Sequence, residues 1–307
     1  MKLSICEKSS QDTIFSFVLE KMPLKFRVLI TEFCQNQVFG AINEIRIKRN
    51  AYLYLIADSN TVKTDIFING EDIDEIFEYL CNHSYYSCIN TLKNGYVPIG
   101  SGVRAGISGN AILENNQIIG VNEISSINIR IPQKIPNAAK YVFSLMKNDN
   151  FASSILIFSP PGVGKTSILR DLILKLNQSE PPLRFSVIDA RSEILTPFMK
   201  SLCCDVFTSY PKGVGIELAT KSMTPEIIIC DEISNEEDAN AILKAAHCGV
   251  KIIATTHAAS IEELLNKSIL KELIERGTFD LFLGVTRMRG ERKYDFTTHY
   301  FKDITKI

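Results

Sequence analysis

Apolar residues recur at helical spacing near the start of the chain. Ile14, Val18 and Leu19 fall on one face, Pro23 interrupts the pattern, and it resumes from residue 26 to residue 33. This predicts two helices within residues 10–37. The same spacing predicts a helix at 72–81. Alternating apolar and polar residues predict strands at 43–48, 52–56, 96–99, 103–113, 117–121 and 127–131. Helices followed by a run of hairpin-like strands indicate an α+β domain.

In the second half of the chain, strands alternate with helices. Apolar runs predict strands at 155–158, 184–189, 226–231, 250–255 and 279–285, with an added edge strand at 292–301. Helical spacing predicts helices at 138–147, 165–176, 236–247 and 261–275, the last with a capping box of Ser260 and Glu263. This alternation predicts an α/β fold whose parallel sheet is covered on both faces. A stretch with two prolines precedes it, so we place the boundary between an N-terminal α+β domain, 1–135, and a second domain, 136–307.

Residues 154–170 combine a buried strand, a Gly/Pro turn and the start of a helix. Such a turn directs successive backbone N–H groups, and the positive end of the helix dipole, at a point where phosphate can sit. Lys165 supplies a positive charge for the β- and γ-phosphates, and the Thr166 hydroxyl is placed to ligate Mg²⁺. The P-loop pattern fails only at its first position, where Ser159 replaces glycine. The candidate nucleotide-binding residues here are Ser159, Pro160, Pro161, Gly162, Val163, Gly164, Lys165, Thr166 and Ser167.

Polar residues follow two further strands, at the carboxyl ends where open parallel sheets bind ligands. Asp231 is placed to hold Mg²⁺ through water, as a Walker B acid, and Glu232 to polarise the attacking water. His257 ends the next strand after two threonines, and we expect it to sense the γ-phosphate. The strand ending in His257 should lie between the P-loop strand and the strand ending in Asp231. That order is typical of RecA-like P-loop ATPases with a catalytic glutamate.

Two acidic residues, Asp189 and Glu193, follow the strand at 184–189. They have two interpretations. Their carboxylates orient water or metal at the nucleotide site, or they pair with Arg191. The sequence leaves both open.

Composition and charge narrow the classes of partner. The 307 residues are 45% hydrophobic and 22% charged, as in ordinary globular proteins. With 34 Lys and Arg against 35 Asp and Glu, the overall charge does not indicate a protein that binds nucleic acid or an anionic membrane. No apolar run is long enough to span a bilayer and the first residues lack a signal-peptide core, so we expect a cytoplasmic protein.

The eight cysteines are expected to stay thiols in that compartment. Cys81, His83 and Cys88 lie close in sequence but lack a CxxC pair, so they are a weak zinc signal. A structural role is the better interpretation. The adjacent Cys203 and Cys204 are likewise interpreted as partly buried structural residues.

Several motifs together resemble one known family. They are residues 159–166 (SPPGVGKT), 189–194 (DARSEI), 221–233 (KSMTPEIIICDEI), 254–258 (ATTHA), 44–47 (EIRI), 102–109 (GVRAGISG) and 124–131 (ISSINIRI). They resemble the stage III sporulation protein AA family, which is similar to the secretion and type IV pilus ATPases. The resemblance covers almost the whole chain. It implies ATP and Mg²⁺ as cofactors, a homo-hexamer, and proteins of a membrane channel complex as partners. The place of action would be the mother-cell cytoplasm, at the channel to the forespore.

The sequence departs from the family pattern at three positions. Ala190 stands where an acidic residue is usual, Lys221 replaces an expected arginine, and Ser159 replaces the commoner glycine. Ala190 weakens the case for a metal role of the loop after residue 189. Lys221 weakens the case for a bidentate phosphate contact at its position, because lysine lacks the planar fork of arginine.

The resemblance also implies that arginines of the N-terminal domain contact nucleotide. Arg104 and Arg130 lie in the matching segments, with Arg46 behind them. Their guanidinium groups would stabilise charge on the transferring phosphoryl group. A structural ion pair is the alternative.

Two rival functions use the same core. A nucleic-acid translocating ATPase would need a basic, aromatic-interleaved groove; Arg287, Arg289, Arg292 and Lys293 form a small basic cluster, but the near-neutral charge argues against stable nucleic-acid binding. An ATP-gated scaffold with little turnover is the second rival. The function we expect is Mg²⁺-dependent ATP hydrolysis.

Overall fold

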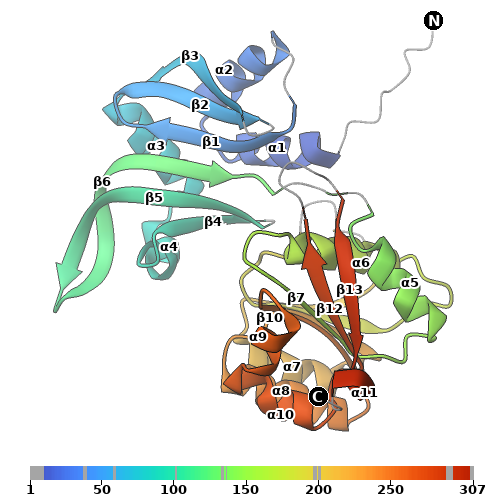
Figure 1. Ribbon diagram of the computed structural model, residues 1–307. Coiled ribbons are helices and arrows are strands. Elements are labelled where there is room, and N and C mark those ends of the chain that lie inside the picture. The colour runs from blue at the N-terminus through green and yellow to red at the C-terminus, as the bar shows by residue number, and fades with distance from the viewer. Residues whose placement is uncertain are drawn as a thin grey trace, which may run out of the picture. The chain divides into compact units, whose positions relative to one another are not determined.

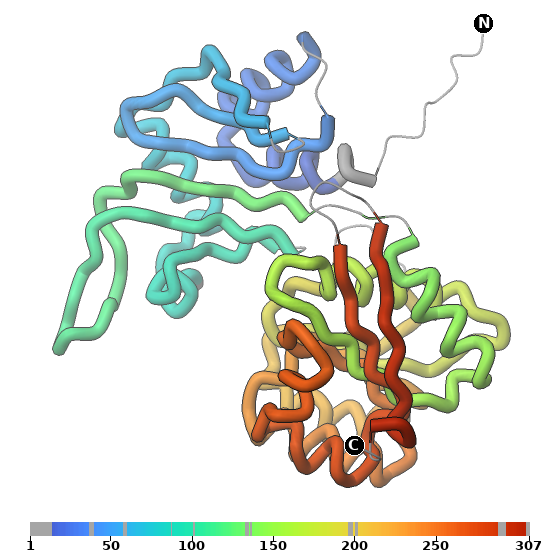
Figure 2. Tube along the Cα trace, in the orientation of Figure 1, coloured from blue at the N-terminus to red at the C-terminus, as the bar shows by residue number. Residues whose placement is uncertain are grey.

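The computed structural model describes residues 10–36, 40–57, 60–100, 102–132, 135, 137–195, 199, 202–287 and 293–304. These residues fall into two compact units, one made by the described residues up to 132 and the other by those from 135 onward. Figure 2 traces both from blue to red along the chain.

The first unit is a six-stranded antiparallel sheet with helices packed on it (Figure 1). Its elements are α1 (Ser10–Glu20), α2 (Leu24–Gln35), β1 (Ile42–Lys48), β2 (Ala51–Ala57), β3 (Asn60–Ile68), α3 (Gly70–Leu80), α4 (Tyr85–Leu92), β4 (Tyr96–Gly100), β5 (Val103–Glu114) and β6 (Gln117–Arg130). The strand order is β3-β2-β1-β6-β5-β4. Alternate residues of β1, β2 and β3 are buried, as expected of a sheet with one face on the core.

The predicted helices and most predicted strands of this unit are confirmed. The helix predicted at 72–81 begins two residues earlier, because Asn69 and Asp72 form a capping box there. Two features differ. The strands predicted at 117–121 and 127–131 are one long strand, β6, in which Glu123 has a φ of 44°. β3 was not predicted.

The second unit is a seven-stranded sheet. Its elements are α5 (Lys140–Asn148), β7 (Ile155–Ser159), α6 (Lys165–Leu176), β8 (Phe185–Asp189), β9 (Asp205–Thr208), α7 (Lys212–Ser222), β10 (Ile227–Glu232), α8 (Glu236–His247), β11 (Lys251–His257), α9 (Ile261–Leu265), α10 (Ser268–Glu275), β12 (Leu281–Thr286), β13 (Asp295–Tyr300) and α11 (Phe301–Ile304). The order β13-β12-β7-β11-β10-β8-β9 confirms the prediction that the strand ending in His257 lies between the other two. Among the described strand pairs of this sheet, β12–β13 alone is antiparallel. β13 lies at the edge of the sheet, so the predicted edge strand is confirmed.

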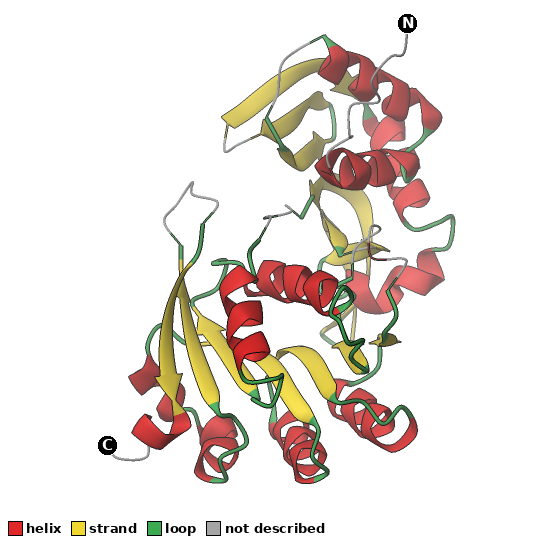
Figure 3. Cartoon of the chain, turned by 90° about the vertical axis from the view of Figure 1, so that its right-hand side faces the viewer, coloured by secondary structure: helices red, strands yellow, loops and turns green. Residues whose placement is uncertain are grey.

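Helices lie on both faces of this sheet (Figure 3). β7 and β8 are buried along their whole length, which is the pattern of parallel strands covered on both sides. Apolar side chains of α7, α8 and α10 form one core cluster with the sheet. The predicted α/β class with a P-loop sheet is therefore confirmed.

Three local predictions for this unit need correction. β9 and α7 were missed. The glycines of α7 weaken its helical signal, but they permit close packing: a Cβ on Gly215 would lie 3.0 Å from Ile188. The helix predicted at 261–275 is two helices, α9 and α10. Ser260 does accept the backbone N–H of Glu263, while the Glu263 carboxylate accepts the N–H of Ala259 instead of completing the capping box.

Candidate functional site

The phosphate-binding turn joins β7 to α6. Ser159 ends β7 in extended backbone, so this position does not need the freedom of glycine. Gly162 and Gly164 do need it, with φ values of 78° and 122°. Gly164 is the N-cap of α6, and no described side chain caps that helix. The first N–H groups of α6 are therefore available to an anion.

Lys165 folds back over the turn from the first position of α6. Its Nζ lies 3.1 Å from the Ser159 carbonyl oxygen, 3.2 Å from Ser159 Oγ and 2.8 Å from His257 Nδ1. Burial lowers the pKa of Lys165 to about 8. The negative charge of Glu232 acts to raise this pKa, and the positive charge of Lys267 acts to lower it further. The lysine that reaches phosphate in P-loop proteins is thus poised on the carboxyl ends of β7 and β11.

His257 connects this lysine to the acidic strand end. An ammonium group only donates hydrogen bonds, so His257 Nδ1 accepts from Lys165 and the ring proton lies on Nε2. Nε2 lies 3.3 Å from Glu232 Oε2. Three candidates from separate strands and turns therefore lie in one line of close contacts, Lys165–His257–Glu232. Arg191 lies 4.0 Å from the same Glu232 oxygen.

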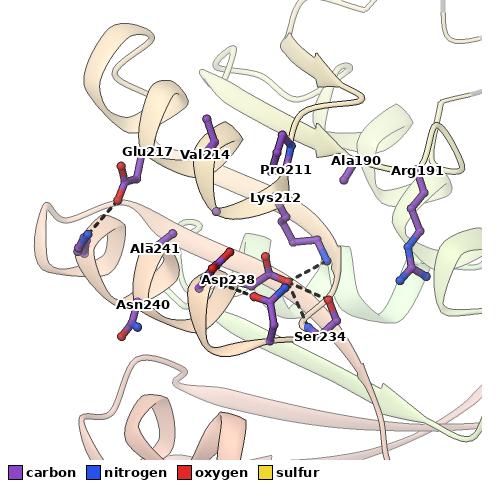
Figure 4. A pocket seen from close by; sticks show the side chains of 14 residues that line it. Ala190, Arg191, Pro211, Lys212, Val214, Glu217, Ser234, Asp238, Asn240 and Ala241 are labelled. Carbon is purple, nitrogen blue, oxygen red and sulfur yellow. Dashed lines mark hydrogen bonds and ion pairs between the residues drawn. The ribbon is translucent and has the colours of Figure 1, made fainter. Parts of the chain in front are cut away.

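Asp231 is paired with a buried lysine, Lys212, that was not predicted from the sequence. Lys212, at the first position of α7, lies 2.9 Å from Asp231 Oδ1 and 3.6 Å from Asp238 Oδ2, and also donates to the Glu232 carbonyl. Lys212, Asp231 and Asp238 are all buried. We call these three residues the lysine–aspartate cluster. Figure 4 shows Lys212 and Asp238 directed at one another beside a cavity of about 470 Å³ at the starts of α7 and α8.

The charges of this cluster affect one another. Burial raises the pKa of Asp231, with Lys212 and Arg191 opposing the rise. For Lys212, burial acts to lower the pKa, but Cys230 and Asp231 outweigh it and the pKa is raised. The ammonium of Lys212 therefore helps to keep Asp231 ionised.

The Asp189 carboxylate, a second candidate, holds a loop. It accepts the backbone N–H groups of Glu193, Ile194 and Leu195 at 2.8–3.1 Å and is fully buried. Arg170 of α6 donates to the carbonyls of Glu193 and Ile194 in the same loop. These contacts favour a structural role for Asp189, but through the loop rather than through the pairing with Arg191 considered above.

The candidate arginines Arg104 and Arg130 belong to the first unit. They face each other across β5 and β6, and Arg130 also pairs with Glu44 of β1 in register. The Arg104 guanidinium lies over the Tyr96 ring at 4.5 Å, and Arg130 Nε lies 3.9 Å from Glu44 Oε1. Arg46 also binds Glu44, at 2.9 Å. The two candidates thus form a positive pair on one face of that sheet.

The remaining sequence candidates have ordinary surroundings. Lys221 is exposed and lies 3.8 Å from Glu217. Cys81 and Cys88 are buried, while His83 is exposed beside Glu78. Within the described ranges, no group of three or more His, Cys, Asp or Glu side chains is arranged to hold a metal ion. Likewise, no described helix is long and apolar enough to cross a membrane. Arg289 and Arg292 lie outside the described residues.

Comparison with solved structures supports the fold. The chain is similar to the Legionella pneumophila ATPase DotB, with a TM-score of 0.61, 14% identity, and coverage of 90% of this chain and 80% of that one. It is also similar to the pilus retraction motor PilT, solved with bound ADP, with a TM-score of 0.62, 16% identity, and coverage of 88% and 81%. At these identities the likeness establishes a shared P-loop fold.

Comparison of sequences identifies the family. The model of the family "Sporulation stage III, protein AA" matches residues 18–293. Stage III sporulation protein AA of Bacillus subtilis (strain 168) is 32% identical over 282 residues, which are 89% of this chain and 91% of that protein. A more distant relative, SEEDLING PLASTID DEVELOPMENT 1 of Arabidopsis thaliana, is 27% identical over 162 residues, 50% of this chain and 23% of that protein. The family match and the motifs at the sheet edge agree: the chain belongs to the stage III sporulation protein AA family.

Proposed function

We propose that this chain is a Mg²⁺-dependent ATP hydrolase. The observation that supports this most strongly is the Lys165–His257–Glu232 chain, with contacts of 2.8 and 3.3 Å at the carboxyl edge of the sheet. The closeness of these three side chains supports a site in which a phosphate-binding lysine, a polar sensor and a carboxylate act on one ligand. Phosphoryl transfer needs mainly positioning and charge neutralisation, and these side chains supply both.

Each residue has a distinct role in this proposal. The N–H groups of the turn and Lys165 bind the β- and γ-phosphates. Glu232 orients the attacking water and accepts its proton. His257 detects the γ-phosphate, because a phosphate that draws Lys165 away removes the donor at Nδ1. The nucleotide thereby changes the contact between His257 and Glu232.

The oxygen donors at this edge suit Mg²⁺. Thr166 is the second residue of α6, and Asp231 is the second-last residue of β10, where Lys212 pairs with its carboxylate. Hydroxyl and carboxylate oxygens are the ligands that Mg²⁺ prefers, usually with several waters retained. Thr166 and Asp231 would hold the ion, and the ion would neutralise charge on the phosphate oxygens.

Membership of the family supports a proposal about the domains, the assembly and the partners. We propose that residues 1–135 and 136–307 act as two domains, and that Arg104 and Arg130 of the first contact the nucleotide. ATP would drive closure between domains within a homo-hexameric ring. The ring would act in the mother-cell cytoplasm, against the proteins of a sporulation membrane complex, and energise or assemble the channel to the forespore.

Two substitutions test the hydrolase. Lys165→Ala should weaken ATP binding strongly, whereas Glu232→Gln should keep binding and lose phosphate release. The measurements are titration with labelled ATP and a phosphate-release assay on the purified protein with Mg²⁺. Lys271→Ala, which removes an exposed lysine of α10, is the control. Undiminished ATP affinity in Lys165→Ala would contradict the proposal.

An ATP-gated scaffold is the second candidate, favoured by one observation. The Glu232 carboxylate is already engaged by His257 at 3.3 Å and faces Arg191 at 4.0 Å, so it must be released before it can orient water. If wild type binds ATP without releasing phosphate, even with the membrane partner present, and Glu232→Gln changes nothing, the scaffold is correct. Stimulation of hydrolysis by single-stranded DNA or RNA would instead favour a nucleic-acid translocating ATPase.

A further inference from the structure

A second cavity, of about 560 Å³, lies between the start of α5 and the start of β13. Aromatic side chains form much of its wall. The rings of Tyr141 and Phe296 stack with centroids 5.1 Å apart and planes 27° apart, and Tyr294 and Phe296 have centroids 6.4 Å apart. We call this cavity the aromatic pocket.

A hydrogen bond holds one ring of the aromatic wall in place. Tyr141 Oη lies 2.9 Å from Thr298 Oγ1 of β13, so the α5 ring is fixed to the strand. Tyr141 is nevertheless 40% exposed. A ring that is fixed and also accessible can stack on a planar ligand with little loss of side-chain entropy.

The aromatic pocket adjoins the phosphate-binding turn. Tyr294 lines the pocket, and its Oη lies 3.5 Å from the Gly164 carbonyl and hydrogen-bonds the Ser167 side chain. A Cβ on Gly164 would lie 2.1 Å from that Oη. The start of β13 pairs with the end of β12, which runs parallel to β7. The pocket and the turn are therefore at the same edge of the sheet.

We propose that the aromatic pocket binds the base and ribose of the nucleotide whose phosphates occupy the turn. This inference rests on the proposed function. The ligand is a nucleoside triphosphate with a purine base, stacked on the Tyr141–Phe296 wall. Ser167, in the first turn of α6, lies beside Tyr294, and the nucleoside extends from the phosphates past Tyr294 into the pocket. Aromatic stacking then supplies affinity that the triphosphate alone does not have.

The test compares a ligand with a base and one without. The purified full-length protein is titrated with ATP and with inorganic tripolyphosphate, each with Mg²⁺. Tyr141→Ala should weaken ATP binding about 10- to 100-fold, the range expected for loss of one stacking partner, and leave tripolyphosphate binding unchanged. Phe296→Ala should give the same pattern. Tyr300→Ala, an exposed tyrosine of β13 that does not line the pocket, should change neither.

The outcomes separate this inference from the proposed function. Lys165→Ala should weaken both ligands, because it acts on the phosphates. If Tyr141→Ala and Phe296→Ala bind ATP as wild type does, or lose both ligands equally, the aromatic pocket is not the base site, while the hydrolase proposal stands. If wild type binds neither ligand, both proposals fail together.

Discussion

Replacing Lys212 with methionine tests the lysine–aspartate cluster. The substitution keeps an unbranched side chain of similar length but removes the ammonium, leaving Asp231 and Asp238 buried without their shared cation. Removing one partner of a buried ion pair costs about 3–5 kcal/mol. For a domain of this size that is a fall in melting temperature of about 6–20 °C.

The matched control is Lys244→Met. Lys244 lines the same cavity as Lys212 and pairs with Glu217 at the same 2.9 Å distance, but its side chain is 70% exposed. Exposed pairs contribute little because water and salt screen them. We therefore expect a melting temperature close to wild type. Equal losses in the two variants, measured by calorimetry, would refute the argument from burial.

The same variant should change the pH dependence of hydrolysis. Lys212 opposes the rise that burial produces in the pKa of Asp231. Without it that pKa rises further, so Asp231 becomes protonated at higher pH and loses its charge for Mg²⁺. The acidic limb of the activity profile should move to higher pH. Lys212→Met combined with Asp231→Asn should regain part of the stability, since no orphaned anion remains at Asp231, but none of the activity.

Three further predictions concern the turn and the loop beside it. Gly164→Ala should destabilise the protein by about 1–3 kcal/mol and abolish ATP binding, because the residue has a φ of 122° and its Cβ would lie 2.1 Å from a tyrosine hydroxyl. Gly162→Ala places no atom within 4 Å of the new Cβ, so it should lower both stability and ATP affinity by less. Asp189→Asn should lower stability by about 1–3 kcal/mol in denaturant titration, because the carboxylate that accepts three backbone N–H groups of the loop loses one acceptor oxygen. It should leave tripolyphosphate affinity near wild type, and a selective loss of that affinity would contradict the structural role of Asp189. ATP affinity should fall as the pH rises through about 8, where Lys165 loses its proton. Lys267→Met should move that fall to higher pH, because it removes a positive charge that repels the Lys165 ammonium. ATP titrations at several pH values measure this, and an unchanged pH profile in Lys267→Met would argue against Lys165 as the titrating group.

The sequence by itself determined the local geometry of the candidate nucleotide site. A strand, a turn with two glycines and a helix are contiguous over residues 155–176, so spacing alone predicts where N–H groups, Lys165 and Thr166 converge. The acidic pair and His257 were also found, since each directly ends a strand and parallel strands bring their carboxyl ends to one edge.

Only the tertiary structure decided which side chains meet across that edge. Lys212 was missed because its helix has a weak apolar pattern, and its partners are brought to it by packing of α7 on the sheet. Tyr294 lies 130 residues from Gly164 along the chain yet within hydrogen-bonding reach of it, and no local pattern records that approach. Asp189 is placed by its strand, but its ligands come from the path of the following loop. Such contacts depend on the folded positions of distant segments, which residue periodicity does not specify.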